Sequence, residues 1–303
     1  MSTEAHSPRF AELDAWNSLD VLRALHEGQL AAVAAVGPAL PAIAAAAEAA
    51  VPRLRRGGRL VYAGAGTSAR IGVQDGAELP PTFSWPEHRL AFLVAGGQRA
   101  ILQAVENAED STADAETQVA AAAIGADDVV IGLAASGTTP FTLAVLRAAA
   151  ARGALTIGLA NNPDSPVLRA SAHPVAVDTG EEVVAGSTRL KAGTAQKVVL
   201  NLFSTLVMVR LGRVYRGRMV DMRATNSKLR HRAEAMVAEL AEVEPAAARQ
   251  ALDAAGGEVK LAILLALGFD RAAAEDRLAR GDGSLRAALA EASPAGPGTG
   301  SPA

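Results

Sequence analysis

The chain has 303 residues, a net charge of −3 and a pI near 6.0; half of its residues are apolar and 3% are aromatic. This length can bury a full α/β core with room for one smaller unit, and the charge gives no reason to expect a nucleic acid or an anionic membrane as partner. The absence of cysteine excludes disulfides and thiolate catalysis, and the five histidines show no H-x-x-x-H spacing, which argues against a metal site. The polar N-terminus and the lack of a stretch that we consider long and uncharged enough to span a bilayer predict a cytoplasmic protein.

The N-terminal region, residues 1–49, is predicted to be a tail followed by helices. Residues 1–12 are polar and are predicted to be disordered. Alanine-rich helical patterns follow over 13–26 and 30–54, with a break at Gly37-Pro38. Such helices can cover a sheet or mediate dimerisation, and a scaffold role is the simpler interpretation.

Between residues 59 and 177 short apolar runs alternate with helical stretches. The predicted strands are 60–63, 90–94, 129–134, 155–160 and 175–177, and the predicted helices are 69–78, 99–110, 139–151 and 165–172. The strands are apolar on both faces, as expected for a parallel sheet covered by helices. The alternation predicts a doubly wound five-stranded sheet within a domain over 50–214, with ligands at the carboxyl ends of the strands.

Two hydroxyl-rich turns follow predicted strands. In the first, GAGTSAR, the residues Gly66, Thr67 and Ser68 lie between a strand and a helix start, where backbone N–H groups and the positive end of the helix dipole attract an anion. The second turn has the same plan and contains Ser136, Gly137, Thr138 and Thr139. The repetition predicts a phosphorylated ligand.

A third polar cluster opens the stretch 181–212, which then becomes apolar at helical spacing. Hydroxyl and cationic residues are concentrated there: Ser187, Thr188, Arg189, Lys191, Thr194 and Lys197. A solvated helix start would explain the charges but not the hydroxyls beside them, so ligand binding is the competing interpretation.

Among 32 acidic residues, two positions have the best claim to chemistry. Glu78 ends the helix that begins at the first turn, immediately before Pro80-Pro81, and a carboxylate at a helix C-terminus is unfavourable for the helix itself. Glu106 and Glu109 lie three apart in AVENAEDS, with a solvated acidic helix end as the simpler interpretation. Two carboxylates beside a sugar phosphate permit isomerisation or elimination, and their spacing does not separate these reactions.

The C-terminal part is predicted to be helical. Residues 215–234 are interpreted as a connection in which Asn226 and Lys228 are further polar candidates, and 235–291 as a small domain of three short helices with a helical extension. The tail over 292–303, rich in glycine, proline and serine, is predicted to be disordered.

Several of these segments closely resemble the N-acetylmuramic acid 6-phosphate etherases, sugar isomerase (SIS) fold enzymes of bacterial cell-wall recycling. The likeness runs in order from about residue 13 to 289 and includes the segments GAGTSARIGVQDGAELPPTF, AVENAEDS, VVIGLAASGTTP, GSTRLKAGTAQKVVLNLFSTLVMVRLG and VYRGRMVDMRATNSKL. The resemblance implies a SIS-type sheet, a lyase that releases D-lactate without a cofactor, and a homodimer.

The resemblance also implies roles for individual residues. Glu78, in GAELPPTF, takes the place of the family's proton donor, and Glu109, the second acid of ENAED, takes the place of the other catalytic glutamate, which we assign as base. For this role Glu78 has to be protonated, and we expect burial or the nearby phosphate to keep it so. The substrate-binding residues would be Gly66, Thr67, Ser68, Ser136, Gly137, Thr138 and Thr139, with Ser187, Thr188 and Lys191 closing the site.

Four positions depart from the family pattern. Thr138 stands where these enzymes often carry arginine, which puts the strength of phosphate binding in doubt unless Lys191 or Arg189 supplies the charge. The other three are Ala69 and Asn107 in place of common glycines, and Leu79 in place of a frequent cysteine.

Other functions remain open at this point. An aldose–ketose isomerase on the same fold would need a base but would release no lactate. A non-catalytic sugar-phosphate sensor, like the regulatory protein that controls glucokinase, could keep the hydroxyl turns and dispense with both glutamates, and their presence argues against it. A third possibility is that the C-terminal helical unit binds a partner protein, although a packing or dimer-contact role is the simpler interpretation.

Overall fold

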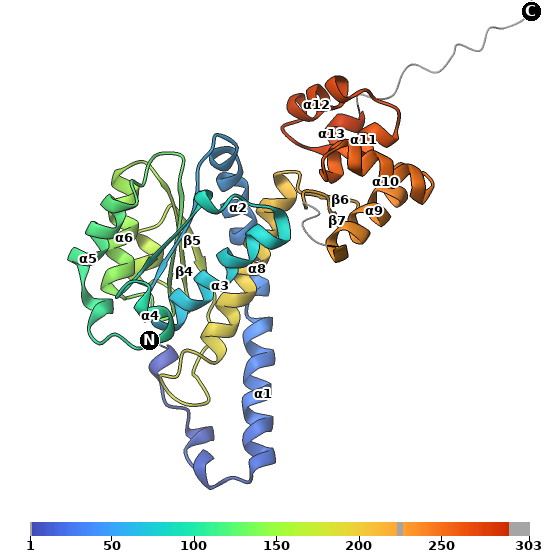
Figure 1. Cartoon of the computed structure of the whole chain (residues 1–303). Coiled ribbons are helices and arrows are strands. Elements are labelled where there is room, and N and C mark those ends of the chain that lie inside the picture. Colours follow the sequence, from blue (N-terminus) through green and yellow to red (C-terminus); the bar gives the residue numbers. More distant parts are fainter. Residues whose placement is uncertain (1, 223–226, 291–303) are drawn as a thin grey trace, which may run out of the picture. The chain divides into compact units, whose positions relative to one another are not determined.

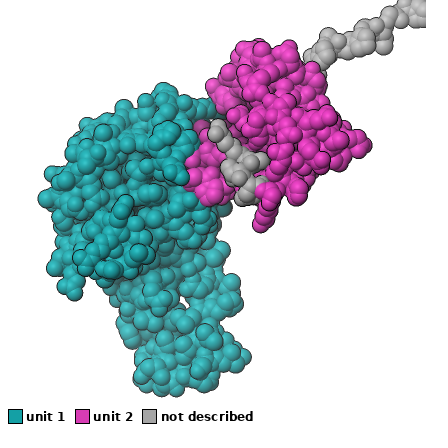
Figure 2. All heavy atoms as spheres, viewed as in Figure 1, with its two compact units in different colours: residues 1–78, 86–207 teal, residues 79–85, 208–303 magenta. Residues whose placement is uncertain are grey.

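The computed structural model of the chain describes residues 2–222 and 227–290, which form two compact units. Unit 1 contains residues 1–78 and 86–207, and unit 2 contains 79–85 and 208–303 (Figure 2). The division falls inside two helices, after Glu78 and after Val207. The predicted boundaries at 214 and 234 remain a prediction, as does the tail over 292–303, which lies outside the described residues.

Unit 1 is built on a parallel five-stranded sheet. Its strands are β1 (Leu60–Gly64), β2 (Leu90–Val94), β3 (Val129–Ala134), β4 (Leu155–Ala160) and β5 (His173–Ala176), in the order β2-β1-β3-β4-β5. The predicted doubly wound sheet is confirmed, with β5 beginning two residues earlier than expected. In this strand order the connections leave in opposite directions from β1 and β3, and the carboxyl ends of those two strands form the topological switch point where ligands bind.

Helices cover both faces of the sheet, as the two-sided apolar strands require (Figure 1). On one face α5 (Thr112–Ala121) and α6 (Pro140–Ala151) pack on inward side chains such as Val61 and Val130. On the other face α2 (Leu40–Arg55), α3 (Gly66–Phe83) and α8 (Lys191–Arg210) lie over residues such as Tyr62 and Ile131. A short helix, α7 (Pro166–Arg169), lies against β4 and β5.

Two helix predictions were wrong. Helix α3 does not stop at the Pro80-Pro81 pair but continues to Phe83. The helix predicted over 99–110 is only α4 (Arg99–Leu102), followed by the 3-10 turn η6 (Ala108–Asp110), and α5 was missed. Asn107 between them has a φ of 58°, a left-handed conformation that ends regular helix.

The N-terminal residues are better ordered than predicted. Short 3-10 turns lie at Ser2–Glu4, Pro8–Phe10 and Leu13–Ala15, and the fully buried Thr3 accepts a hydrogen bond from Asn162 at 2.9 Å. Helix α1 is continuous over Ser18–Ala34, without the expected break near residue 28. The predicted break at Gly37-Pro38 is present as a 3-10 turn at Gly37–Ala39.

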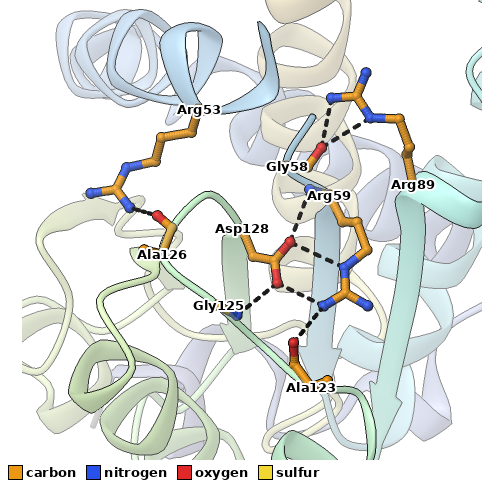
Figure 3. Close-up of polar contacts among 8 residues, drawn as sticks. All are labelled: Arg53, Gly58, Arg59, Arg89, Ala123, Gly125, Ala126 and Asp128. Atoms are coloured by element: carbon orange, nitrogen blue, oxygen red, sulfur yellow. Dashed lines mark hydrogen bonds and ion pairs between the residues drawn. The ribbon is translucent and has the colours of Figure 1, made fainter. Parts of the chain in front are cut away.

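An ionic cluster joins α2 to the amino ends of the strands (Figure 3). Arg59 donates to both carboxylate oxygens of Asp128, at 3.1 and 2.7 Å, and the backbone N–H groups of Gly125 and Arg59 donate to the same carboxylate. Arg53 and Arg89 donate to backbone carbonyls, including that of Gly58. Burial alone would raise the pKa of Asp128, but the donors around it outweigh burial and lower that pKa.

Replacing Asp128 by asparagine should lower the free energy of unfolding at neutral pH by about 2–4 kcal/mol, because the charged acceptor of several donors is lost. Because the folded-state pKa is lowered, the stabilisation is present above the unfolded value of about 4 and is lost as the pH falls below it. Melting temperatures between about pH 7 and pH 3 measure this: the wild type should lose more stability than Asp128→Asn. The matched control is Asp127→Asn, which breaks an exposed pair with Arg56 and should cost less than about 1 kcal/mol. An unchanged stability of Asp128→Asn would contradict the assignment.

Unit 2 is a small helical domain with its own apolar core. Its elements are the two-stranded hairpin β6 (Val214–Tyr215) and β7 (Arg218–Met219), followed by α9 (Ser227–Ala241), α10 (Pro245–Ala254), α11 (Val259–Ala266), α12 (Arg271–Arg280) and α13 (Leu285–Ala290). The predicted C-terminal helices are confirmed, and the helical region begins earlier than expected.

Two stretches in the described part of the chain are long and apolar enough, by length and composition, to cross a membrane: Ser18–Arg55 and Lys191–Arg210. The expectation that no stretch meets that test was therefore wrong. The apolar window of α8 is 56% buried inside the unit, as in the core helix of a globular domain. The apolar window within Ser18–Arg55 is only 33% buried.

Candidate functional site

The first hydroxyl-rich turn connects β1 to α3. Gly66 has a φ of 52°, a left-handed conformation that glycine adopts without strain, and Thr67 and Ser68 follow it in the first helical turn. A Cβ on Gly64 would lie 3.0 Å from the carbonyl oxygen of Leu133, so this strand end also needs glycine. The first N–H groups of α3 thus point beyond the carboxyl edge of the sheet, where they can bind an anion.

The second turn connects β3 to α6 and lies beside the first, because Gly64 pairs with Leu133 at the ends of β1 and β3. Gly137 has a φ of 72°, and a Cβ there would lie 2.3 Å from the Cβ of Ser165, so only glycine fits. The hydroxyl of Ser136 accepts hydrogen bonds from the N–H and hydroxyl of Thr138, at 3.2 and 3.1 Å. Thr139 precedes the first residue of α6.

The third cluster lies at the start of α8. Gly193 allows a close approach: a Cβ at this position would lie 3.5 Å from the Thr67 side chain and 3.3 Å from the Thr188 carbonyl oxygen. The Thr67 side chain thus lies close to the backbone at the start of α8. Ser187 and Thr188 are partly exposed, as is the first hydroxyl-rich turn at Thr67.

The N-terminus of α8 itself is already occupied by a carboxylate. Glu182, which is 1% exposed, accepts hydrogen bonds from the N–H groups of Lys191 and Ala192, both at 2.9 Å. The Lys191 ammonium group donates to the Glu181 carbonyl oxygen at 2.7 Å and lines a cavity of about 510 Å³ together with Asp178 and Glu181. Of the two helix starts, α3 is therefore the one left open for a ligand anion.

Glu109 lies in η6, after the strand that borders β1 on its other side. Its loop is fastened to the beginning of α3, because Arg70 donates to the carbonyl oxygens of Ala100 and Ile101 at 3.1 and 2.9 Å. Turn η6 also packs against α6. The Glu109 side chain is exposed on the same edge of the sheet as the two hydroxyl-rich turns.

Glu78 is not brought to this edge. It lies 12 positions after Gly66 on α3, which corresponds to about 18 Å along the helix axis and is longer than a hexose 6-phosphate. The side chain is exposed and accepts a 3.5 Å hydrogen bond from Gln74. Glu78 was expected to be buried, but no residue in the described part of its own chain shields its carboxyl group from water. Lys228, a further polar candidate, is exposed on α9 of unit 2, and Asn226 lies outside the described residues.

A buried network near Glu78 was missed from the sequence. Asp75, one helical turn before Glu78, accepts hydrogen bonds from the Tyr62 hydroxyl at 2.8 Å, from Asn201 at 3.1 Å and from Ser204 at 3.2 Å. Burial raises the pKa of Asp75, and these three donors oppose that effect. The network fastens α3 to β1 and α8. No periodicity distinguishes Asp75 from the other acids, so only its partners reveal its position.

The described residues contain no group of three or more histidine or acidic side chains that could hold a metal ion. The chemistry available at the sheet edge is that of backbone N–H groups, hydroxyls and carboxylates. Such a set can bind a phosphate and transfer protons.

Comparison with protein families places the chain among SIS domains. Residues 42–150 match the glucokinase regulatory protein N-terminal SIS domain family, and residues 99–206 match the SIS domain family. Much longer matches exist to proteins named N-acetylmuramic acid 6-phosphate etherase. The protein from Deinococcus radiodurans is 52% identical over 95% of both chains; that from Streptomyces avermitilis is 47% identical over 96% of this chain and 94% of its own.

Similar solved structures include a phosphoheptose isomerase from Francisella tularensis, with a TM-score of 0.49 and 20% identity over 64% of this chain and all of its own. An E. coli CFT073 protein solved in complex with A5P has a TM-score of 0.49 and 20% identity over 66% of this chain and 96% of its own.

Proposed function

The chain belongs to the N-acetylmuramic acid 6-phosphate etherase family, and we propose that Glu109 and Glu78 are the base and the acid of its reaction. The enzyme is a carbon–oxygen lyase. It cleaves the lactyl ether of N-acetylmuramic acid 6-phosphate by elimination and water addition, giving N-acetylglucosamine 6-phosphate and D-lactate. The observation that carries this function is the likeness at 43–52% identity along at least 95% of the chain, which includes the helical unit as well as the SIS domain.

The proposed roles follow from the chemistry of the open-chain sugar. The hydrogen on C2 is acidic because it lies next to the C1 aldehyde, and the carboxylate of Glu109 removes it. Lactate would be a poor leaving group as an alkoxide, so the carboxylic acid of Glu78 protonates the ether oxygen as the bond to C3 breaks. Water then adds at C3 of the unsaturated aldehyde, with Glu78 as base and Glu109 returning the proton to C2.

We propose that the domain over 50–214 binds the phosphate at the open start of α3. Gly66, Thr67 and Ser68 contribute N–H groups and hydroxyls, and the second turn contributes Ser136, Gly137, Thr138 and Thr139. Ser187 and Thr188 close this site from the adjacent segment. Fewer observations support a substrate-binding role for Lys191. Its ammonium group already donates to a carbonyl group, and Glu182 caps the helix that begins at Lys191.

We further propose that each site takes its acid from a second copy of the chain. Three observations support this: Glu109 and the hydroxyl turns share one sheet edge, Glu78 lies about 18 Å along α3 from the helix start, and Glu78 is exposed on its own chain. A homodimer that brings Glu78 of one copy to the sheet edge of the other would complete the site and shield that carboxyl group from water.

Helix α1 has the surface that such a homodimer requires. Its small residues Ala24, Gly28 and Ala32 are buried on one face, with Gly28 against Val183. The opposite face exposes large apolar side chains over several turns: Leu19 56%, Leu22 62%, Leu30 59% and Val33 49%. A helix that is apolar on both faces is normally buried on both. We propose that a second copy of the chain covers the exposed face of α1, because the shared site already requires a second copy.

Replacing Leu22 and Leu30 together by glutamate should convert the dimer into a monomer, because charge then enters the proposed contact. The variant should still fold, since both side chains are exposed on the single chain, and its melting temperature should fall only by the stabilisation that dimerisation gives. Sedimentation velocity measures the mass, and lactate release should be lost with the dimer. The control is Leu267→Glu, which changes a leucine of unit 2 that is 44% exposed and should leave the mass unchanged. A double variant that remains dimeric would contradict this interface.

We propose that the enzyme needs no cofactor, that neither nucleic acid nor a membrane is its partner, and that it acts in the cytoplasm. The donor set at the site supports the first point, and the net charge of −3 supports the second. The substrate supports the third: a charged sugar phosphate does not cross a bilayer unaided, so it stays in the compartment where it is formed, which we take to be the cytoplasm.

The function is tested by D-lactate release from N-acetylmuramic acid 6-phosphate, with and without a chelator. Release that is unaffected by the chelator is the expected result. A folded protein that binds the sugar phosphate but releases no lactate would instead be a sensor of the kind to which the glucokinase regulatory family belongs.

A further inference from the structure

The end of helix α3, directly after Glu78, belongs to the helical unit. Residues 79–85 cluster with 208–303, and Trp85, which is 1% exposed, is among the largest fully buried side chains of the described chain. Glu78 is therefore the last residue of unit 1 before the helix continues into unit 2. The backbone position of Glu78 depends on what holds the five residues that follow it in α3.

The helix itself holds this turn weakly. Pro80 and Pro81 have no N–H group, so the carbonyl groups of Gly76 and Ala77 lack their usual partners four residues later. Ser84 has a φ of 51° and ends the helix, and beyond the helix end the N–H of Trp85 donates a long hydrogen bond of 3.4 Å to the carbonyl of Leu79. Contacts from outside the helix must therefore stabilise the end of α3.

Arg213 supplies these contacts. Its guanidinium group donates to the carbonyl oxygens of Phe83 at 2.6 Å and of Ser84 at 3.2 Å, and it lies over the Trp85 ring, 5.1 Å from the centroid. A cation is favourable at this end of a helix, where unpaired carbonyls carry the negative end of the dipole.

Arg213 is in turn fixed by an ionic chain whose side chains are largely buried, with exposures of 10–27%. Asp221 pairs with Arg213 at 2.8 Å and with Lys260 at 2.9 Å, and Lys260 also donates to the Gly283 carbonyl oxygen at 2.6 Å. Because Lys260 belongs to α11 and Gly283 to the segment between α12 and α13, this chain connects the end of α3 to the core of the helical unit.

We propose that Arg213 is a positioning residue for Glu78, and that the helical unit serves the reaction by fixing the end of α3 that carries the acid. This inference rests on the proposed role of Glu78. Arg213 itself touches neither substrate nor the reacting atoms.

The test compares Arg213→Met with Lys260→Met. Both remove one cation from the same buried cluster and should lower the melting temperature, but only Arg213 contacts α3. We expect Arg213→Met to lower kcat for lactate release at least ~10-fold with KM unchanged, because a misplaced acid reduces the rate of the chemical step and not binding. Lys260→Met leaves the Arg213–Asp221 pair and the contact of Arg213 with Phe83, so its kcat should fall much less than that of Arg213→Met. Arg213→Lys should recover part of the loss through its charge and single donor.

A double variant distinguishes an effect of Arg213 on the position of Glu78 from a general loss of active-site structure. In the Glu78→Gln background, Arg213→Met should lower kcat no further, because it acts through Glu78. A normal kcat in a folded Arg213→Met enzyme, or equal losses in both backgrounds, would overturn the inference. A normal kcat in Glu78→Gln alone would instead overturn the proposed role of Glu78.

Discussion

Replacing either Glu109 or Glu78 by glutamine should lower kcat for D-lactate release by about 10²- to 10⁴-fold, the range expected for the loss of a general base or acid. Glutamine keeps the size of the side chain but can neither remove the C2 proton nor protonate the leaving oxygen. Both glutamates are exposed on the single chain, so stability should change by less than about 0.5 kcal/mol. Steady-state assays of lactate release, beside thermal unfolding, measure both quantities.

The matched control is Glu106→Gln. Glu106 lies three residues before Glu109 in the same acidic segment and is equally exposed, but it has no proposed role. Its kcat should remain within about threefold of the wild type, as is usual for an uninvolved surface group. A large loss in Glu106→Gln with a normal Glu109→Gln would reverse the assignment of the base.

Mixing the two inactive variants should restore activity. If Glu78 serves the site of the other copy, a heterodimer of Glu78→Gln and Glu109→Gln chains has one site with both glutamates and one with neither. Random reassociation makes half of the dimers mixed, so about a quarter of the wild-type rate should return, provided that each site works independently. If both glutamates served the site of their own chain, every site in the mixture would lack one of them.

The measurement requires dissociation and reassociation of the two variants, followed by the lactate assay. Wild-type enzyme taken through the same steps gives the reference rate. A mixture that stays as inactive as its components, although native mass spectrometry shows heterodimers, would contradict the shared site and leave the catalytic roles themselves untouched.

The sheet and its two hydroxyl-rich turns could be predicted from the sequence because local patterns determine them. Three of the five strands have their predicted bounds, since each is a short apolar run between polar turns. Glycines at residues 66 and 137 marked turns that need left-handed backbone conformations. The doubly wound order then brings the two turns together.

The misses have a common origin in tertiary contacts. Helix α3 continues through Pro80-Pro81 because Arg213, 130 residues after Phe83, holds its end. Residues 2–12 are ordered because Thr3 is buried against Asn162. The anion site expected at the start of α8 is filled by Glu182, whose carboxylate caps the helix from within the chain. Arg213 and Asn162 lie more than 100 residues from their partners, so no local pattern indicates them. Glu182 lies nine residues before Lys191, which is also beyond the three-residue spacing of a capping box.

The relation between the two proposed catalytic residues could be predicted only in part. The predicted helix over 69–78 already places Glu78 far from the first hydroxyl-rich turn, whereas Glu109 lies in the turn η6 against α6, where a regular helix was predicted. On the proposed roles, a single chain would hold the base beside the sugar-phosphate site and would lack the acid.

The most direct test of the account is the reaction of N-acetylmuramic acid 6-phosphate in ¹⁸O-labelled water, with both products weighed by mass spectrometry. Elimination breaks the bond between C3 and the ether oxygen, so D-lactate should leave unlabelled and N-acetylglucosamine 6-phosphate should carry one ¹⁸O at C3. Label in the lactate, or no lactate from folded enzyme, would contradict the account.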